Sequence, residues 1–146
     1  MDMSAVTGPL PSQEWRGRYL NALLRGMNNA LEAIEAAAVV SRDGVVIASV
    51  SGTSVDPETC TRLCTGMAGL ADRMASEMER GHAGLVLVEA EMGSMLLVRA
   101  DANTSLVVAA RPKANLSVML RTVRDTALKI QFCSDGSRLA AGAARR

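Results

Sequence analysis

Apolar and polar residues alternate along the chain with two different periods. Apolar positions recur three or four residues apart from Ser12 or Gln13 to about Ile34, from Pro57 to about Arg80, and from Ala114 to Gln131. This spacing predicts three amphipathic helices. Gly81 follows the second helix and is its expected stop, because glycine readily takes the left-handed conformation that ends helices.

Short apolar runs between these helices predict five strands. The first two are joined by Arg42-Asp43-Gly44, and Asp-Gly between β-branched runs is the strongest short-range hairpin signal. The last three are joined by links too short for parallel crossovers, so they form an antiparallel meander. The five predicted strands are Ala36 to Ser41, Val45 to Val50, Gly84 to Ala90, Ser94 to Ala100 and Ser105 to Ala110.

The resulting order is α-β-β-α-β-β-β-α. It predicts an α/β (α+β) fold in which helices cover both faces of a five-stranded antiparallel sheet. Residues 1–12 carry no periodic pattern, and residues 134–146 resemble a tail. We therefore expect a flexible N-terminal arm over 1–12, one domain over 13–133, and a flexible C-terminal tail over 134–146.

Composition narrows the possible functions of the chain. Its formal net charge is only +1, and aromatic residues make up 2% of its 146 residues. Nucleic-acid binders need a basic excess, and single-strand binders also need aromatic stacking platforms, so nucleic acid is excluded as an expected partner. No apolar run approaches the length of about 20 residues that a membrane span needs. An odd number of cysteines without a signal peptide predicts reduced thiols in the cytoplasm.

No arrangement of residues predicts catalysis. His82 is the only histidine and follows a helix stop, which favours a surface or capping role over a catalytic triad. Cys60 and Cys64 share one face of the second helix, and only Cys133 and His82 could complete a metal site with them. Buried apolar thiols are the favoured interpretation. There is no phosphate-binding glycine motif, so we expect no catalytic residues, cofactor or metal, and no enzyme.

The hairpin Ala38 to Ala48, the long helix from Pro57, the meander Leu85 to Ala110 and the final amphipathic helix together resemble the roadblock/LC7 family. This family includes dynein light chains and bacterial MglB-like regulators, and the resemblance covers roughly residues 14–131. It implies a homodimer whose edge strands pair into one continuous sheet, with the second helices side by side across the dyad. It also implies that the protein regulates or scaffolds a small Ras-like GTPase.

Two sets of residues are the candidates for these contacts. The strand Gly84 to Ala90 lacks the lysines, prolines and bulges that usually protect an edge, so we expect it to pair with its copy. The predicted dimer interface consists of Leu85, Val86, Leu87, Val88, Gly66, Gly69, Met67 and Met74. The candidate GTPase contacts, which would share the polar face of the second helix, are Arg62, Arg73 and Arg80.

A second hypothesis comes from another class of function. A small-molecule sensor or general adaptor of profilin-like or PAS-like shape would have similar elements. It would also require a cavity between sheet and helix with polar groups converging on it. The expected core positions are nearly all aliphatic or methionine, which disfavours a polar ligand.

Overall fold

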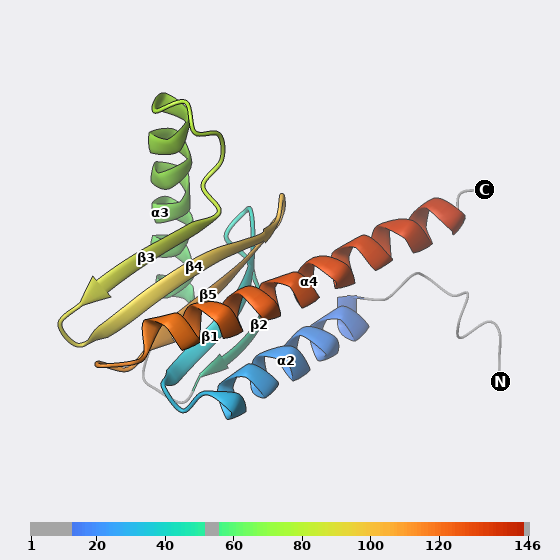
Figure 1. Cartoon of the computed structure of the whole chain (residues 1–146). Coiled ribbons are helices and arrows are strands. Elements are labelled where there is room, and N and C mark those ends of the chain that lie inside the picture. The colour runs from blue at the N-terminus through green and yellow to red at the C-terminus, as the bar shows by residue number, and fades with distance from the viewer. Residues whose placement is uncertain (1–12, 52–55, 145–146) are drawn as a thin grey trace.

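The computed structural model describes residues 13–51 and 56–144 and contains the predicted order of elements (Figure 1). Each element is of the type, helix or strand, that the spacing of its apolar residues predicts. The helices are α2 (Gln13–Ala30), α3 (Pro57–Glu77) and α4 (Leu116–Ala144). The strands are β1 (Ile34–Ser41), β2 (Val46–Ser51), β3 (Leu85–Ala90), β4 (Gly93–Asp101) and β5 (Thr104–Ala110).

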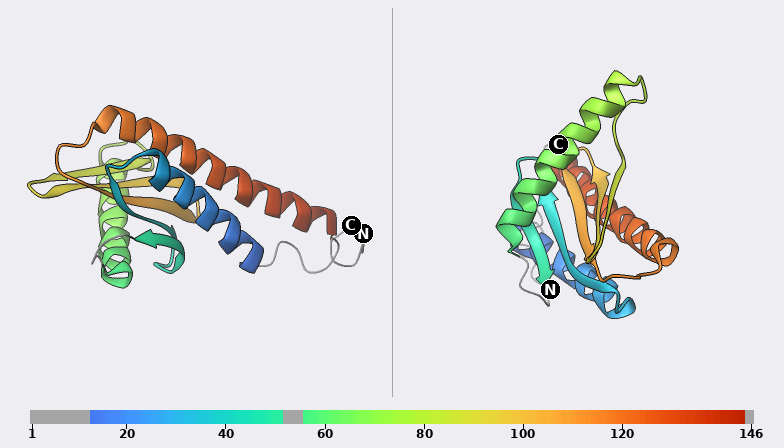
Figure 2. Two further views of the ribbon diagram at one scale, coloured as in Figure 1. Left: turned by 90° about the horizontal axis from the view of Figure 1, so that it is seen from below. Right: turned by 90° about the vertical axis from the view of Figure 1, so that its left-hand side faces the viewer.

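The strands form one antiparallel sheet in the order β2-β1-β5-β4-β3. This confirms the predicted five-stranded sheet and places β3 at an edge. Helices α2 and α4 lie side by side on one face, and α3 crosses the opposite face (Figures 1 and 2). The predicted helices on both faces are therefore confirmed.

The main hydrophobic core lies between the sheet and the α2–α4 pair. Leu20 and Leu24 of α2 and Ile130 of α4 are fully buried there against Leu96 and Leu106 of the sheet. The same face holds many further buried side chains, including Met27, Ile34, Val39, Val98, Val108, Met119, Val123 and Ala127. Aliphatic side chains and methionine thus build this core, as the scarcity of aromatic residues requires.

The Asp-Gly hairpin is confirmed, although its two turn residues do not both take positive φ. Only Gly44 does so, at 86°, and its N–H donates to the Ser41 carbonyl at 3.0 Å. This is a type I turn followed by a left-handed glycine, the usual geometry of longer hairpin loops. A Cβ on Gly44 would also lie 3.3 Å from Oγ1 of Thr65, so the turn packs closely under α3.

The second helix ends earlier than predicted. Helix α3 stops at Glu77, and the first left-handed residue after it is Glu79, with a φ of 58°; Gly81 follows with a φ of 81°. The Arg80 N–H donates to the Ala75 carbonyl, and the Glu79 N–H donates to Ser76. This pair of hydrogen bonds is a Schellman motif, which satisfies carbonyls that the helix end would otherwise leave unpaired.

The other two helices also differ from their predicted bounds. Helix α2 ends at Ala30, because Ile34 already belongs to β1. Helix α4 continues to Ala144, so residues 134–144 are helical where the sequence predicted a flexible tail. The predicted arm, 1–12, lies outside the described residues.

Candidate interaction surface

Helix α3 rests on the sheet along a narrow line of side chains. Its first turn is capped by Asp56, whose carboxylate accepts hydrogen bonds from the Thr59 hydroxyl at 2.6 Å and the Glu58 N–H at 3.3 Å. Both hydrogen bonds lower the pKa of Asp56, and the bond from Thr59 has the larger effect. Below α3 the buried cluster consists of only Val40, Cys64, Leu97 and Val107.

The rest of the apolar side of α3 faces away from the sheet. We call Leu63, Leu70, Met74 and Met78 the open stripe; they are 68%, 67%, 64% and 66% exposed. The single apolar face predicted for this helix is therefore divided into a half that contacts the sheet and a half that does not. An exposed row of large apolar side chains marks an interaction surface more often than an ordinary surface.

The neighbouring edge strand β3 also has exposed apolar residues. Leu85 packs against the main core and Val86 against the α3 cluster, while Leu87 and Val88 are 38% and 41% exposed. The N–H of Arg99 donates to the Gly84 carbonyl at 2.9 Å. This hydrogen bond shows which residues of β3 form hydrogen-bonded pairs with β4 and which do not.

In an antiparallel ladder, hydrogen-bonded pairs alternate with non-bonded pairs. Val86 lies two residues beyond Gly84 and opposite Leu97, so its N–H points toward β4. The N–H groups of Leu85, Leu87 and Glu89 point toward the open side of the sheet. Within the described residues β3 has no neighbour on that side, which leaves donors and acceptors there for another strand.

The other predicted interface residues lie in different surroundings. Met74 belongs to the open stripe, and Met67 is half-buried against the α3 cluster. A Cβ added at Gly66 or Gly69 would meet no atom within 4 Å. Space for a close helix neighbour is therefore present at both glycines, although Gly69 also lines the groove described below.

A polar contact fastens the chain between α3 and β3. Asp72 of α3 accepts a hydrogen bond from the Ala83 N–H at 2.9 Å and binds Nη2 of Arg99 at 2.7 Å. The hydrogen bond from Ala83 lowers the pKa of Asp72 most, and the Arg99 guanidinium lowers it further. We call these three residues the Asp72 clasp; the sequence pattern does not reveal it, because Asp72 and Arg99 lie 27 positions apart.

A groove of about 470 Å³ runs beside the clasp, between α3 and the ends of β1, β4 and β5. Its polar lining includes Asp72, His82, Arg99 and Asp101. Both carboxylates are already engaged, because Asp101 accepts hydrogen bonds from the Asn103 N–H at 2.8 Å and the Thr104 hydroxyl at 2.9 Å. The groove's polar groups thus mainly bind one another.

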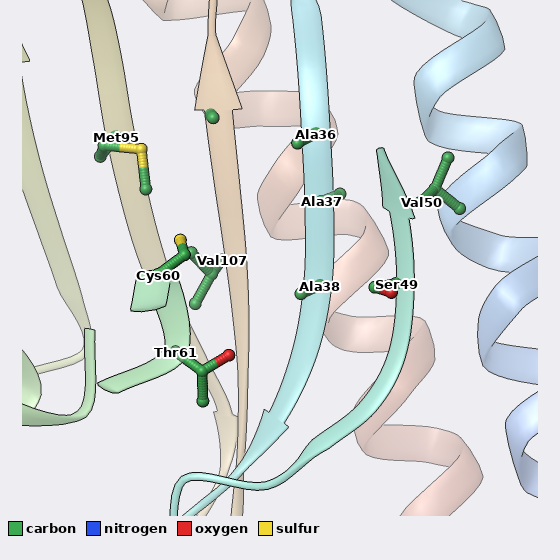
Figure 3. Close-up of a pocket in the computed structure, with 10 residues that line it drawn as sticks. Ala36, Ala37, Ala38, Ser49, Val50, Cys60, Thr61, Met95 and Val107 are labelled. Carbon is green, nitrogen blue, oxygen red and sulfur yellow. The ribbon is translucent and has the colours of Figure 1, made fainter. Parts of the chain in front are cut away.

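A second hollow lies under the first turns of α3 (Figure 3). Its volume is about 30 Å³, and it is lined by small or apolar side chains, among them Ala38, Cys60, Met95 and Val107. This volume corresponds to about one water molecule, far below the several hundred Å³ of ligand pockets. It does not provide the ligand cavity that the sensor hypothesis requires.

Within the described residues, the candidate thiols are not arranged as the ligands of a metal ion. Sγ of Cys60 lies 3.9 Å from Sγ of Cys64, and burial together with Cys60 raises the pKa of Cys64 to about 12. Burial also raises the pKa of Cys133. His82 is exposed. In the part of the chain that the structure describes, no three His, Cys, Asp or Glu side chains form a group suited to a metal.

The three candidate arginines are all exposed, but they do not share one helix. Nε of Arg73 lies 3.2 Å from Oε1 of Glu77, and Nη2 of Arg62 donates to the Thr59 hydroxyl at 3.4 Å. Arg80 lies beyond the end of α3, within the Schellman motif. The predicted line of arginines along one helical face is therefore limited to Arg62 and Arg73.

The fold agrees with that of known proteins. The family model described as Roadblock/LC7 domain matches residues 22–110. The chain belongs to the Roadblock/LC7 family. Two uncharacterized proteins of Methanocaldococcus jannaschii are 37% identical to this roadblock/LC7 chain over 65 residues, which is 44% of the chain and 57% of either relative. The match thus spans little more than half the length of these relatives.

Solved structures show the same fold at low sequence identity. MglB of Myxococcus xanthus has a TM-score of 0.76 and 15% identity, over 82% of this roadblock/LC7 chain and 90% of MglB. An MglB with a tetrameric arrangement has a TM-score of 0.78 and 14% identity, over 84% and 92% of the two chains. A Roadblock/LC7 domain of Streptomyces avermitilis has a TM-score of 0.71 and 19% identity, over 76% and 93%.

Among the described residues, none of the helices is both long enough and apolar enough to cross a membrane.

Proposed function

We propose that this roadblock/LC7 domain is a non-enzymatic cytoplasmic homodimer that binds and regulates a small Ras-like GTPase. The observation that carries the proposal is the adjacency of the open stripe on α3 and the unpaired edge of β3. Both offer apolar contact, and the edge also offers backbone hydrogen bonds. A single interface with a second copy would bury the open stripe and also pair the edge of β3.

The alternation along β3 suits a two-fold axis. The outward N–H and C=O groups of Leu85, Leu87 and Glu89 would pair with those of the same strand in the second copy. The sheet then continues from one copy to the other. On the α3 side, the open stripe meets its equivalent, and the uncrowded Gly66 lets the two helices approach closely.

GTPase binding would use polar surface that the dimer leaves exposed. Arg62 and Arg73 project from α3, and Arg80 follows its end, so each copy presents exposed arginines on and next to α3. Charged side chains of this kind could order the switch loops of a GTPase and thereby change its activity. This regulation requires no nucleophile, metal or general base in the roadblock/LC7 chain itself.

The sensor hypothesis has less support. The cavity under α3 has a volume of about 30 Å³, too small for an organic ligand. The larger groove is polar, but its carboxylates are engaged by Arg99, Ala83, Asn103 and Thr104. Neither hollow combines an apolar enclosure with several available polar groups.

Two measurements test the proposal. Light scattering of the full chain at micromolar concentration should give twice the 15.3 kDa mass of the monomer; a monomer would contradict the dimer. Binding to a small Ras-like GTPase from the same genome, loaded with GDP or a GTP analogue, should depend on the nucleotide. Equal absence of binding in both states would contradict the regulatory role.

A matched pair of variants locates the contact. Arg62→Gln, Arg73→Gln and Arg80→Gln together should weaken GTPase binding at least tenfold, since charged contacts at an interface are worth about 1.4 kcal/mol or more. The control is Arg121→Gln, Arg124→Gln and Lys129→Gln on α4, which removes the same charge from the other side of the sheet. Equal effects of the two variants would mean that the arginines act only through overall charge.

A further inference from the structure

Charge is distributed unequally between the two sides of the sheet. Among the side chains that the structure describes, helices α2 and α4 carry Arg16, Arg18, Arg25, Arg121, Arg124 and Lys129 against Asp125 alone. Helix α3, on the other side, has Arg62 and Arg73 against Glu58, Asp72 and Glu77. The chain as a whole is nearly neutral, so the basic excess is a local property of the α2–α4 layer.

Several of these cations are fully available to a partner. Arg25, Arg121, Arg124 and Lys129 are exposed, and none of them forms an ion pair within the described part of the chain. Their charges are therefore not neutralised by the protein. Asp125 is the one acidic residue among the exposed, described side chains of these two helices.

The same layer exposes every aromatic residue of the chain. Trp15 and Tyr19 of α2 stack with ring centres 5.5 Å apart and are 49% and 37% exposed. On α4, Phe132 is 72% exposed, and Leu128, one turn earlier, is 52% exposed. A protein with so few aromatic side chains thus leaves all of them outside its core.

The two helices form a long outer face (Figure 2). They lie side by side and extend together past the end of the sheet, with Trp15 near the start of α2 and Phe132 in the second half of α4. The groove and the small cavity both lie on the α3 side of the sheet. A long, basic face with exposed aromatic residues suits a flat partner better than an inserted peptide.

We propose that the outer face of α2 and α4 binds the surface of a lipid bilayer containing anionic lipids. Lysine and arginine side chains would contact the lipid phosphates, with a gain of about fivefold in affinity for each. Tryptophan, tyrosine and phenylalanine prefer the boundary between headgroups and acyl chains. Neither helix enters the hydrocarbon as a span, in agreement with the absence of a membrane-crossing helix in the described chain.

The proposed lipid surface is compatible with the dimer and does not depend on it. If β3 pairs with its copy, one continuous sheet carries both α2–α4 layers on the same side. The two copies would then bind one bilayer together, which raises the apparent affinity without any new contact. The α3 side, with its candidate GTPase contacts, would face away from the membrane.

The single tryptophan makes the test specific for this face. Full-length protein is mixed with vesicles of phosphatidylcholine alone or of phosphatidylcholine with an equal part of phosphatidylglycerol. We expect sedimentation with the anionic vesicles only, together with a blue shift of the Trp15 emission. Salt at about 1 M, where the Debye length is about 3 Å, should release most of the protein.

The two triple variants introduced above separate the two proposals. Arg121→Gln, Arg124→Gln and Lys129→Gln should reduce vesicle binding by about a hundredfold, at about fivefold for each charge. Arg62→Gln, Arg73→Gln and Arg80→Gln should bind vesicles as the wild type does. Phe132→Ser, which keeps every charge and the fluorescent probe, should reduce binding as well. Circular dichroism confirms that each variant stays folded.

Three outcomes would overturn the proposal. The first is absence of both sedimentation and emission shift with the anionic vesicles. The second is an equal loss of binding in the two triple variants, which would indicate attraction by total charge. The third is tight binding of soluble polyglutamate without any binding of vesicles, which would assign the face to an acidic protein partner. None of these outcomes affects the dimer or its GTPase contact.

Discussion

The two faces of the sheet differ in how completely helices cover them. On the α2–α4 face, Leu20, Leu24, Leu106 and Ile130 are fully buried in one large cluster. On the α3 face, the buried cluster is reduced to Val40, Cys64, Leu97 and Val107, and the open stripe remains outside. Two helices close one face, and a single helix leaves the other face open.

The closed face and the open face should therefore contribute to different properties: the first to the stability of one chain, the second to its association. Burial of apolar surface provides most of the free energy of folding, so the closed face should determine whether one chain folds. The open face still carries large exposed apolar side chains and an edge strand that has no neighbour on its open side within the described residues. The apolar arc of α3 is thus wider than the part of it that the sheet covers, and the proposed dimer would cover the rest.

The largest expected effect compares one leucine from each face. Leu24→Ala removes a fully buried side chain of α2 and should lower the free energy of unfolding by about 2–5 kcal/mol. Leu70→Ala, on the open stripe, should change it by no more than about 0.5 kcal/mol. Denaturant unfolding at concentrations below the dimer dissociation constant measures both.

Self-association should show the opposite order, with Leu70→Ala weakening the dimer and Leu24→Ala leaving its interface intact. Analytical ultracentrifugation provides that measurement. If Leu70→Ala destabilised the isolated chain as strongly as Leu24→Ala, the face would already be closed within one molecule. The comparison between the two faces would then be wrong.

The sequence predicts the elements well because their signals are local. Helical spacing identifies α2, α3 and α4, and Asp43-Gly44 identifies the hairpin, since each depends on neighbours only a few residues away. The exposed backbone of β3 is also foreseen, from the lack of lysine and proline in Leu85–Ala90. These features require no knowledge of how helices sit on the sheet.

The unpredicted features depend on tertiary placement. Cys64 and Leu70 belong to the same predicted apolar face, yet Cys64 is 4% exposed and Leu70 is 67% exposed. Periodicity measures the width of an apolar arc and not which part of it another element covers. The pairing of Asp72 with Arg99 joins α3 to β4 and is equally invisible to a local pattern. The role of the predicted interface residues stays a prediction.

A smaller effect is expected at the edge of the sheet. Leu87→Pro removes an N–H that points toward the open side, so the monomer should fold while the dimer loses one donor in each copy, about 2 kcal/mol in total. Leu87→Ala, which keeps the N–H, is the matched control. Sedimentation equilibrium should show a larger loss in Leu87→Pro than in Leu87→Ala, because both variants shorten the Leu87 side chain at the predicted interface and only proline also removes the N–H.

Proline at the preceding position sharpens this test. The N–H of Val86 points toward β4, so Val86→Pro should disrupt the ladder inside one chain and lower its stability. If Leu87→Pro and Val86→Pro behaved alike, the alternation derived from the Gly84–Arg99 bond would be incorrect.

The hairpin under α3 should be sensitive to a side chain at its left-handed glycine. Gly44→Val combines a φ of 86° with a Cβ only 3.3 Å from Oγ1 of Thr65, and should lower stability by about 1–3 kcal/mol. Gly44→Asn should lower it less, because asparagine tolerates the left-handed region. Thermal unfolding compares the variants, and equal melting temperatures for wild type and Gly44→Val would contradict the turn geometry.

The smallest expected effect concerns the Asp72 clasp, the polar fastening of the open face. Hydrogen bonds from Ala83 and the Arg99 guanidinium hold the pKa of Asp72 below its ordinary value of about 3.9. A carboxyl with a lowered pKa stabilises the fold above its unfolded pKa, and the contribution disappears as the pH falls through its folded pKa. Asp72→Asn should therefore cost about 1 kcal/mol at neutral pH and less as the pH falls below about 4.

Urea unfolding at a series of pH values measures this difference, and subtracting the two curves cancels the titration of Asp56 and other shared groups. Asp125→Asn on α4 is the control, because that carboxylate is exposed and forms no ion pair in the described chain. Its effect should stay within about 0.5 kcal/mol. A difference for Asp72→Asn that did not shrink in acid would show that the clasp acts through packing and not through charge. The contact of Asp72 with Ala83 and Arg99 would then hold the open face equally well at every pH.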